Sequence, residues 1–349
     1  MPRRHPKGVR LLVRTTTDQS LKVTRFGELK IRQSAGRRSP ATRNRALVRV
    51  EYASVGVTDV MAARGDYHLQ PVPGFVTGYD FVGIVESLPP GSLSGLRVGQ
   101  RVAGVLPAMG AHATRLAVRP DILVPVPSAL HAASAATILL DAVTAMHALR
   151  LANLERGDSV LIQGAGGAFG SWAVQFGLLA GLCVYGTASN RSASHATSLG
   201  ADCYDYTHGD WKEQLLSAAS GGVDAVIDHT GDRELPAVVR EGGSIVRIAF
   251  GGQSGRQRRA TVHGSVSTLL RSRGNPREVL CSLPLALRTK PRFLRSLLQE
   301  AMTQAAEGSV RPPEPERISF EDSLQCFAQL AQLPAGRKAV LAMPDHPRP

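Results

Sequence analysis

A series of glycines in the middle of the chain directly follows an apolar segment. The segment ends at residue 163, and Gly164, Gly167 and Gly170 come next at intervals of three. In this arrangement the first glycine permits a tight turn, the second lets the backbone approach a phosphate, and the third lets a helix pack closely on its strand. The free N–H groups at the start of that helix then face the anion. The spacing therefore indicates a site for the pyrophosphate of a dinucleotide.

The flanking sequence supplies the elements that this motif requires. Residues 160–163 predict a strand, a helix is expected to begin at Ala168, and residues 183–187 predict a second apolar strand roughly twenty residues downstream. The alternative is an ordinary glycine-rich turn, which needs none of these neighbours.

The residues after the second strand bear on the choice of dinucleotide. NAD is usually recognised there by an acidic side chain that accepts hydrogen bonds from the ribose hydroxyls. This chain has Thr187, Ser189, Asn190 and Arg191 instead, with no carboxylate. Arginine binds phosphate bidentately, so this composition suits a ribose phosphate. We therefore expect NADPH; the alternative is a solvated arginine in a polar turn.

The middle of the chain alternates between strands and segments long enough for crossover helices. The predicted strands are residues 160–163, 183–187, 203–206, 223–228 and 244–248. This alternation is typical of a parallel, doubly wound sheet of the α/β class. Residues 251–275 are basic and contain glycines, and we interpret them as a loop or mobile excursion.

The two ends of the chain have a different pattern. Before residue 125, short strands predicted at 47–52, 81–86, 101–105 and 116–118 are separated by glycine and proline turns and indicate a compact β-rich domain. The prolines within 125–127 mark a boundary. After residue 290 we expect helices at 293–306 and near 322–333, and a final strand at 338–342.

Composition limits the class of protein. A chain of 349 residues with 43% hydrophobic content is long enough for two soluble domains. No uncharged apolar stretch reaches the roughly 18 residues of a membrane span, and the basic N-terminus has no apolar segment of the signal-peptide kind, so a cytoplasmic location is expected. Four cysteines lie far apart and predict buried, reduced thiols: Cys183, Cys203, Cys281 and Cys326.

The charge is strongly basic, with 41 Lys and Arg against 28 Asp and Glu, a net +13. Much of it lies in three arginine clusters: Arg37, Arg38, Arg43 and Arg45; Arg256, Arg258 and Arg259; Arg271, Arg273 and Arg277. Aromatic residues are only 5% and none lies among these arginines, which disfavours a nucleic-acid surface and favours a solvated one.

Several motifs in this order resemble the medium-chain dehydrogenase/reductase superfamily, in particular its zinc-free, quinone oxidoreductase-like (zeta-crystallin-like) branch. The motifs lie at residues 78–85, 98–102, 141–149, 164–170, 186–189, 199–202, 222–228 and 336–341, and the resemblance covers nearly the whole chain.

The resemblance implies a GroES-like catalytic domain of residues 1–127 and 316–349, a Rossmann domain of residues 128–315, and an active-site cleft between them. Homodimers are common in the family, so a homodimer is expected. The residues that the resemblance assigns to the NADPH site are Thr144, Gly164, Gly166, Gly167, Ala168, Phe169, Gly170, Thr187, Ser189, Asn190, Arg191, Asp228, Thr230, Ile248 and Ala249.

The chain departs from the zinc-dependent alcohol dehydrogenases of this superfamily at their catalytic-metal ligands. Those enzymes use a Cys, a His and a Cys, and the corresponding residues here are Gly56, Tyr79 and Leu140. Glycine and leucine offer no side-chain donor and a neutral tyrosine is a poor one, so no metal is expected. The remaining chemistry is hydride delivery to an electron-poor carbon, as in a quinone or the β-carbon of an enone or enoyl compound.

Such a reaction builds charge on the acceptor oxygen and requires a proton at the neighbouring carbon. Tyr67 and Tyr79 are the candidate hydrogen-bond donors, although each is also explained as a packed aromatic. Asp141 interrupts an apolar run and is a candidate proton donor with a raised pKa, or a hydrogen-bonded structural group. His112 and His147 are expected to be packed or exposed, without a chemical role.

We thus expect a reductase of small molecules, either quinones or activated double bonds, in a biosynthetic pathway. Two alternatives remain: a catalytically weak NADPH-binding protein that uses its basic surface, and an NADPH-dependent carbonyl reductase. The fold alone separates none of these.

Overall fold

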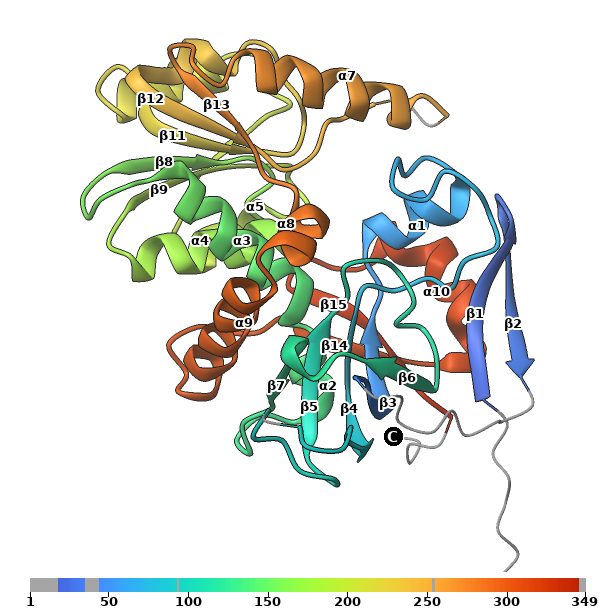
Figure 1. Cartoon of the computed structure of the whole chain (residues 1–349). Coiled ribbons are helices and arrows are strands. Elements are labelled where there is room, and N and C mark those ends of the chain that lie inside the picture. The colour runs from blue at the N-terminus through green and yellow to red at the C-terminus, as the bar shows by residue number, and fades with distance from the viewer. Residues whose placement is uncertain (1–17, 35–43, 93, 253–254, 345–349) are drawn as a thin grey trace, which may run out of the picture.

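A computed structural model describes residues 18–34, 44–92, 94–252 and 255–344, which form two lobes, each built on its own sheet (Figure 1). Arg37, Arg38 and Arg43 of the first arginine cluster lie outside the described residues. No helix in the described ranges is long and apolar enough to cross a membrane.

One lobe is built on a six-stranded parallel sheet in the order β10-β9-β8-β11-β12-β13. Its strands are β8 (Ser159–Ile162), β9 (Cys183–Ala188), β10 (Asp202–Asp205), β11 (Val223–Asp228), β12 (Val239–Arg247) and β13 (Arg277–Leu280). Relabelled by sequence, this is the 3-2-1-4-5-6 order of the Rossmann fold, in which the strand order reverses between β8 and β11. The predicted doubly wound sheet is confirmed.

Helices cover both faces of this sheet, and alternate strand residues divide between them. Ile162 and Ile227 belong to the apolar cluster under α3 (Leu139–Ala152) and α4 (Ala168–Leu179), which also includes α9 (Pro291–Ala306). Leu161 and Val226 belong to a second cluster beneath α6 (Trp211–Ala218). Burial on both faces explains why these strands are continuously apolar. A short helix, α5 (Ala193–Ser198), connects β9 with β10.

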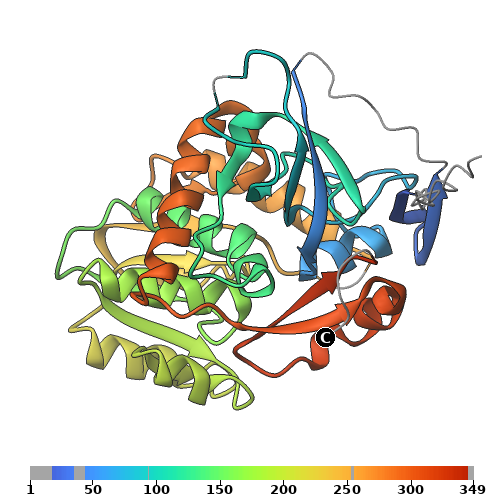
Figure 2. The same ribbon diagram turned by 90° about the horizontal axis from the view of Figure 1, so that it is seen from below.

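The other lobe contains a seven-stranded sheet that joins both ends of the chain. Its order is β14-β15-β3-β4-β5-β7, with β6 also paired to β3. The strands are β3 (Ala46–Ser54), β4 (Asp80–Ser87), β5 (Arg101–Val105), β6 (Arg115–Val118), β7 (Leu123–Pro125), β14 (Glu314–Ser319) and β15 (Arg337–Ala342). β15 pairs antiparallel with β3, so the last strand lies beside the first strand of this sheet (Figure 2).

Smaller elements complete this lobe. A hairpin of β1 (Asp18–Arg25) and β2 (Glu28–Ser34) lies at its outer side, and the helices are α1 (Val57–Arg64), α2 (Ala132–Ala136) and α10 (Ser323–Gln329) (Figure 1). The joining of N- and C-terminal segments agrees with the discontinuous domain that the resemblance implies, while the boundaries at 127 and 316 stay predictions.

Two expectations from the sequence are wrong. Residues 251–275 contain a helix, α7 (Gln257–Leu270), rather than a loop throughout. Its apolar side chains, Val262, Val266, Leu269 and Leu270, are exposed. Cys183 is also exposed, because it stands at the start of β9.

The remaining cysteines agree better with the prediction, and all four are free thiols. Cys281 and Cys326 are buried, and burial raises the pKa of both thiols to about 12. Cys203 is partly buried.

Candidate active site

A cavity of about 220 Å³ lies where the two lobes meet. Its walls come from α1, the loop after α1, the start of α3, the segment following β12, α7, and α8 (Leu283–Thr289) with the residues just before it. Residues that line it include Met61, Tyr67, Leu69, Tyr79, Leu140, Thr144, Ile248, Ala249, Thr261, Ser265, Cys281 and Leu283. Two candidate catalytic residues and three candidate cofactor ligands therefore share one cavity.

The two candidate tyrosines form a hydrogen-bonded pair. The hydroxyl of Tyr79 donates to the hydroxyl of Tyr67 at 3.0 Å, and the rings meet edge to face. Burial raises the pKa of Tyr67 to about 12 and raises the pKa of Tyr79 as well. Both phenols are therefore neutral near pH 7. Because Tyr79 supplies the proton of the shared bond, the proton of Tyr67 is left for another acceptor.

Backbone contacts fix the position of Tyr79. The carboxylate of Asp59 accepts hydrogen bonds from Gly56 N–H and from Gly78 N–H, both at 2.9 Å. Gly78 has φ +88, and a Cβ there would lie 2.5 Å from the ring of His112. His112 is fully buried and contacts Thr77 Oγ1 and the Ser54 carbonyl. It is thus a packed histidine, as expected, that holds the turn before Tyr79.

The start of α3 is anchored to the sheet by a buried carboxylate. Asp80 accepts from Ser54 N–H and from Leu140 N–H. Burial raises the pKa of Asp80 to about 7, although the charge of Lys338 opposes this rise. One turn further, Thr144 donates to the carbonyl of Leu140 at 2.6 Å and faces the cavity.

Asp141 does not line the cavity and is paired. Its carboxylate lies 2.6 Å from Lys338 Nζ, across 197 residues of sequence. Lys338 is itself buried, and the charges of Asp141 and Asp80 raise its pKa against the lowering effect of burial. This placement corresponds to the structural alternative for Asp141, a contact that joins β15 to α3.

The glycine turn between β8 and α4 has the close approaches that its spacing predicts. A Cβ on Gly170 would lie 2.1 Å from the carbonyl of Gly164, and one on Gly166 would lie 2.3 Å from the carbonyl of Ser192. Gly164 itself has φ +66. No side chain caps α4 at Gly167, so the first N–H groups of α4, from Ala168 onward, lack a partner within the helix. The turn therefore has the form of an anion cradle.

The residues after β9 lie beside this turn. Thr187 is fully buried; its hydroxyl accepts from Gly164 N–H and donates to Gln163. Thr187 thus stabilises the turn through these hydrogen bonds. Ser189 is partly buried, and Asn190 and Arg191 are exposed. The guanidinium of Arg191 donates to the carbonyl of Ala331 in the other lobe, at 3.1 Å.

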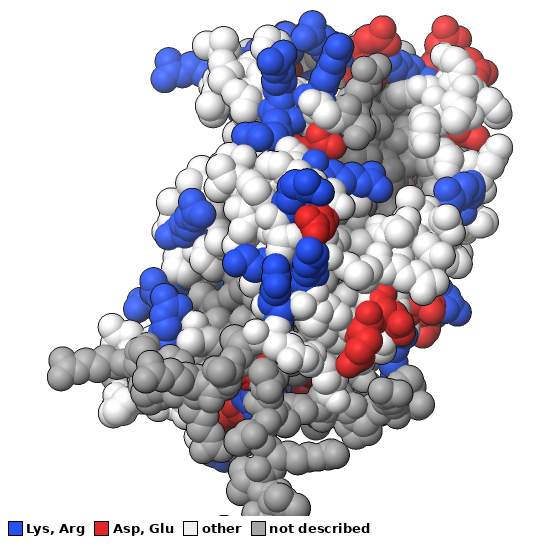
Figure 3. Space-filling view, turned by 90° about the vertical axis from the view of Figure 1, so that its right-hand side faces the viewer, with Lys and Arg blue, Asp and Glu red and all other residues white. Residues whose placement is uncertain are grey.

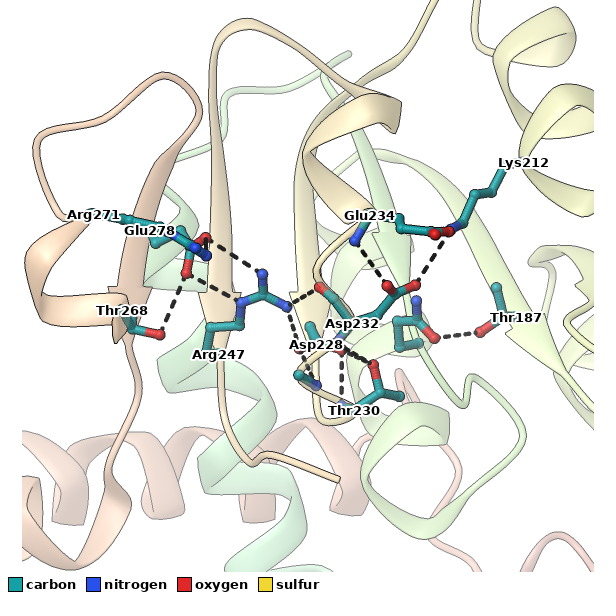
Figure 4. Close-up of polar contacts among 12 residues, drawn as sticks. Thr187, Lys212, Asp228, Thr230, Asp232, Glu234, Arg247, Thr268, Arg271 and Glu278 are labelled. Carbon is teal, nitrogen blue, oxygen red and sulfur yellow. Dashed lines mark hydrogen bonds and ion pairs between the residues drawn. The ribbon is translucent and has the colours of Figure 1, made fainter. Parts of the chain in front are cut away.

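Asp228 ends β11 and orders the loop that follows it. Its carboxylate accepts from Thr230 N–H, Thr230 Oγ1 and Gly231 N–H, and it pairs with Arg247 Nη1 at 2.7 Å. These four bonds occupy the carboxylate, so its side chain shapes the loop. Arg247 is only 2% exposed and also contacts Glu278, which accepts from Thr268 of α7 (Figure 4). A continuous polar chain thus links the Asp228 loop to α7.

Helix α7 is the part of the site that the sequence did not predict. Gln257, Thr261 and Ser265 line the cavity, and Gly255 N–H just before the helix donates to Asp66 of the other lobe at 2.8 Å. The recurrence of Val262, Val266 and Leu269 at helical spacing was the available signal.

The three residues that the resemblance places at zinc-ligand positions are Gly56, Tyr79 and Leu140. Gly56 caps α1, while Tyr79 and Leu140 line the cavity. A Cβ on Gly56 would lie 3.5 Å from Lys338 Nζ, so a buried cation stands beside this position. Within the described ranges no three or more His, Cys, Asp and Glu side chains are grouped to hold a metal ion.

Comparison with protein families assigns both lobes. The alcohol dehydrogenase GroES-like domain matches residues 42–128, and the zinc-binding dehydrogenase domain matches residues 168–278. The chain belongs to the medium-chain dehydrogenase/reductase superfamily. A solved quinone oxidoreductase shares its fold, in agreement with the predicted quinone oxidoreductase-like branch. A Rossmann fold in this superfamily implies a nicotinamide cofactor and an oxidoreductase activity.

Individual relatives add detail. Over 304 residues, or 86% of this chain, it is 29% identical to a phenolphthiocerol/phthiocerol polyketide synthase of Mycobacterium tuberculosis, but it spans only 14% of that protein. It is 31% identical over 201 residues to the trans-enoyl reductase traG of Penicillium crustosum, covering 51% of this chain and 55% of that one.

Solved structures share the superfamily fold. The JamJ enoyl reductase superposes with a TM-score of 0.82 at 20% identity, covering 94% of this chain and all of that one. A quinone oxidoreductase of Pseudomonas syringae pv. Tomato DC3000 gives a TM-score of 0.76 at 20% identity, with 93% and 99% covered.

Proposed function

We propose that this superfamily member is an NADPH-dependent reductase of carbon–carbon double bonds conjugated to a thioester carbonyl. The hydrogen-bonded pair of Tyr67 and Tyr79 in the interlobe cavity carries the proposal, because it offers a neutral O–H donor beside the position of Thr144. The likeness to a trans-enoyl reductase and to polyketide synthases supports a biosynthetic enoyl substrate.

The cofactor site fits a dinucleotide with a ribose phosphate. Gly166 and Gly170 let the turn pack against the backbone of Ser192 and Gly164, where a Cβ would collide, and the unpartnered N–H groups of α4 suit a pyrophosphate. Ser189 and Arg191 would hold the additional phosphate of NADPH, with no carboxylate on the segment 187–192 to repel it. Bound NADPH would supply the hydride for the reaction.

The remaining candidate ligands divide by what the fold leaves free. Thr144, Ile248 and Ala249 would contact the nicotinamide end, since they line the cavity. Asp228 would act through the loop that it orders, because its carboxylate already has four donors. Thr187 would likewise act by supporting the glycine turn.

Tyr67 is the proposed donor to the acceptor oxygen. As the β-carbon gains a hydride, electron density moves to the thioester oxygen, and an O–H aimed at that oxygen lowers the barrier. Tyr79 keeps Tyr67 oriented by donating to its oxygen at 3.0 Å. The raised pKa of Tyr67, about 12, keeps this proton in place at physiological pH. The same hydroxyl is our candidate for supplying the proton to the α-carbon.

The lining of the cavity fits an acyl chain. Leu69, Leu140, Ile248 and Leu283 give it apolar walls. Asp141 is assigned a positioning role, since Lys338 is its partner and it does not face the cavity. We further propose that the reaction needs no zinc, given Gly56 and Leu140 at the ligand positions, and that the protein is a cytoplasmic homodimer.

The test is loss of NADPH absorbance with purified protein and crotonyl thioesters, quinones and simple ketones, repeated with NADH. Rapid oxidation of NADPH with the thioester, slower with NADH and about 100-fold slower in the Tyr67→Phe variant, is the expected result. Turnover confined to quinones would select the second candidate acceptor, and turnover confined to ketones would select a carbonyl reductase. Tight NADPH binding without turnover on any acceptor would refute the enzyme in favour of a binding protein.

A further inference from the structure

Two arginines, Arg258 and Arg288, lie on α7 and α8, the two helices that line one side of the interlobe cavity. Arg258 lies on the face of α7 that also carries Thr261 and Ser265, at spacings of three and seven residues, and both of these line the cavity. Arg288 lies one turn beyond Pro284, a lining residue of α8. Burial and the charge of Arg258 both lower the pKa of His68, which lines the cavity. The charge of Arg288 lowers the pKa of Tyr67, against the larger rise that burial causes.

Neither arginine has a partner among the residues that the structure describes. Within the described ranges no ion pair or hydrogen bond involves Arg258 or Arg288, whereas Arg150 and Arg240 are paired with Glu300 and Asp224. Arg258 is half-buried, which makes an uncompensated charge there more costly than on an open surface. Lys and Arg side chains are also gathered on this side of the molecule, where the N-terminal end of α7 lies (Figure 3).

The cavity and these arginines together describe an amphipathic ligand. An apolar portion suits the walls formed by Leu69, Leu140 and Leu283. An anionic portion suits the two arginines on the lining helices α7 and α8. A guanidinium group can bind two oxygens of one phosphate, so these arginines favour a ligand with a phosphate over an uncharged ligand.

We propose that Arg258 and Arg288 bind the phosphate at the outer end of a pantetheine arm that carries the acyl thioester. This inference rests on the proposed function, which places the thioester in the cavity. The phosphate is shared by coenzyme A and by the prosthetic arm of a carrier protein, so both are sources of the same recognised group.

The first experiment compares crotonyl-phosphopantetheine with crotonyl-pantetheine, which lacks only the phosphate. The kcat/KM for crotonyl-phosphopantetheine should exceed that for crotonyl-pantetheine by about tenfold or more, because its KM is lower. Added salt should remove this difference. Arg258→Gln and Arg288→Gln should each reduce that preference about threefold to tenfold and leave crotonyl-pantetheine unaffected. Arg259→Gln, the exposed neighbour on α7, is the matched control and should change neither substrate.

The source of the phosphate is separated with crotonyl-coenzyme A and a crotonyl carrier protein. An equal loss for both in the Arg258→Gln, Arg288→Gln double variant supports recognition of the shared phosphate. A loss confined to coenzyme A supports the same site with coenzyme A as its ligand. No loss with either overturns the site.

Calorimetric binding of phosphopantetheine, which has no acyl group, tests the site without turnover. Weaker binding in the double variant by about tenfold or more is expected. If no thioester is reduced but this binding persists and depends on the arginines, the proposed reaction fails and the site stands. If thioesters are reduced with equal kcat/KM with and without phosphate, the reaction stands and the site fails.

Discussion

The hydroxyl of Tyr79 donates to the hydroxyl of Tyr67 at 3.0 Å, which leaves the second tyrosine with a proton of its own at the cavity. Tyr67→Phe should therefore lower kcat about 100-fold, the usual cost of removing one donor to a developing oxyanion. Tyr79→Phe should cost less, about tenfold, because Tyr67 keeps its proton but loses orientation. Steady-state kinetics measures kcat for both variants, and a fluorescence titration measures their affinity for NADPH. Equal losses of NADPH affinity in the two variants would contradict the assigned roles.

The ionisation of Tyr67 sets a pH dependence. Burial raises the pKa of its phenol to about 12, so the neutral form that donates persists through pH 10, where an ordinary tyrosine is half ionised. Turnover should stay level between about pH 8 and pH 10.5 and fall only above it. The measurement is the kcat profile in that range, with circular dichroism to confirm that the protein remains folded. A midpoint near pH 10 would show an unperturbed phenol.

Arg191 should govern the choice between the two nicotinamide dinucleotides. Arg191→Ala removes the guanidinium but leaves the glycine turn intact, so NADPH affinity should fall about tenfold to 100-fold and NADH affinity should change less than about twofold. Titrations with both cofactors check this, and NADH serves as the internal control. An equal loss of affinity for NADPH and NADH would contradict the assigned role. It would mean that Arg191 acts only on the structure, through its hydrogen bond to the carbonyl of Ala331.

The buried pair of Lys338 and Asp141 should matter for stability more than for chemistry. Lys338→Met leaves Asp141 and Asp80 without their cation and should reduce the free energy of unfolding by about 3–5 kcal/mol. Urea denaturation measures this loss, and the double variant with Asp141→Leu should recover much of it. Asp141→Asn should keep most of the turnover per folded molecule; a large fall in kcat with intact folding would make Asp141 the proton donor instead.

Arg247 should be equally sensitive, because two buried carboxylates depend on it. Arg247→Met removes the buried cation that pairs with Asp228 and Glu278. This change should also reduce the free energy of unfolding by about 3–5 kcal/mol. Arg271, which pairs with Glu278 from the surface, is the matched control, and Arg271→Gln should cost only about 0–1 kcal/mol. Thermal and urea denaturation distinguish the two variants, and similar losses would contradict the buried network.

The contrast between what the sequence predicted and what it missed follows from the range of the forces involved. The glycine turn is specified locally, since Gly164 needs a left-handed φ and Gly170 needs a missing Cβ, and both requirements are visible in the residue types. The pairing of Tyr67 with Tyr79 depends on how α1 is held by Asp59, and the pairing of Lys338 with Asp141 spans 197 residues. Neither contact leaves a periodic trace.

Helix α7 was missed for a different reason. A helix is normally recognised in a sequence by a wide apolar stripe that packs on the core. Helix α7 instead exposes its few apolar residues, Val262, Val266 and Leu269. Arginines and flanking glycines then dominate the local composition and resemble a loop.

The return of β15 to pair with β3 imposes an order on folding during synthesis. The strands of the six-stranded sheet all precede residue 281, so that lobe has its full set of strands while the ribosome is still adding β14 and β15. Until those last strands emerge, the end of β3 from Tyr52 to Ser54 lacks its partner strand, and Asp141 lacks Lys338. Domains form as units during translation, so the lobe that begins first in the sequence is completed last.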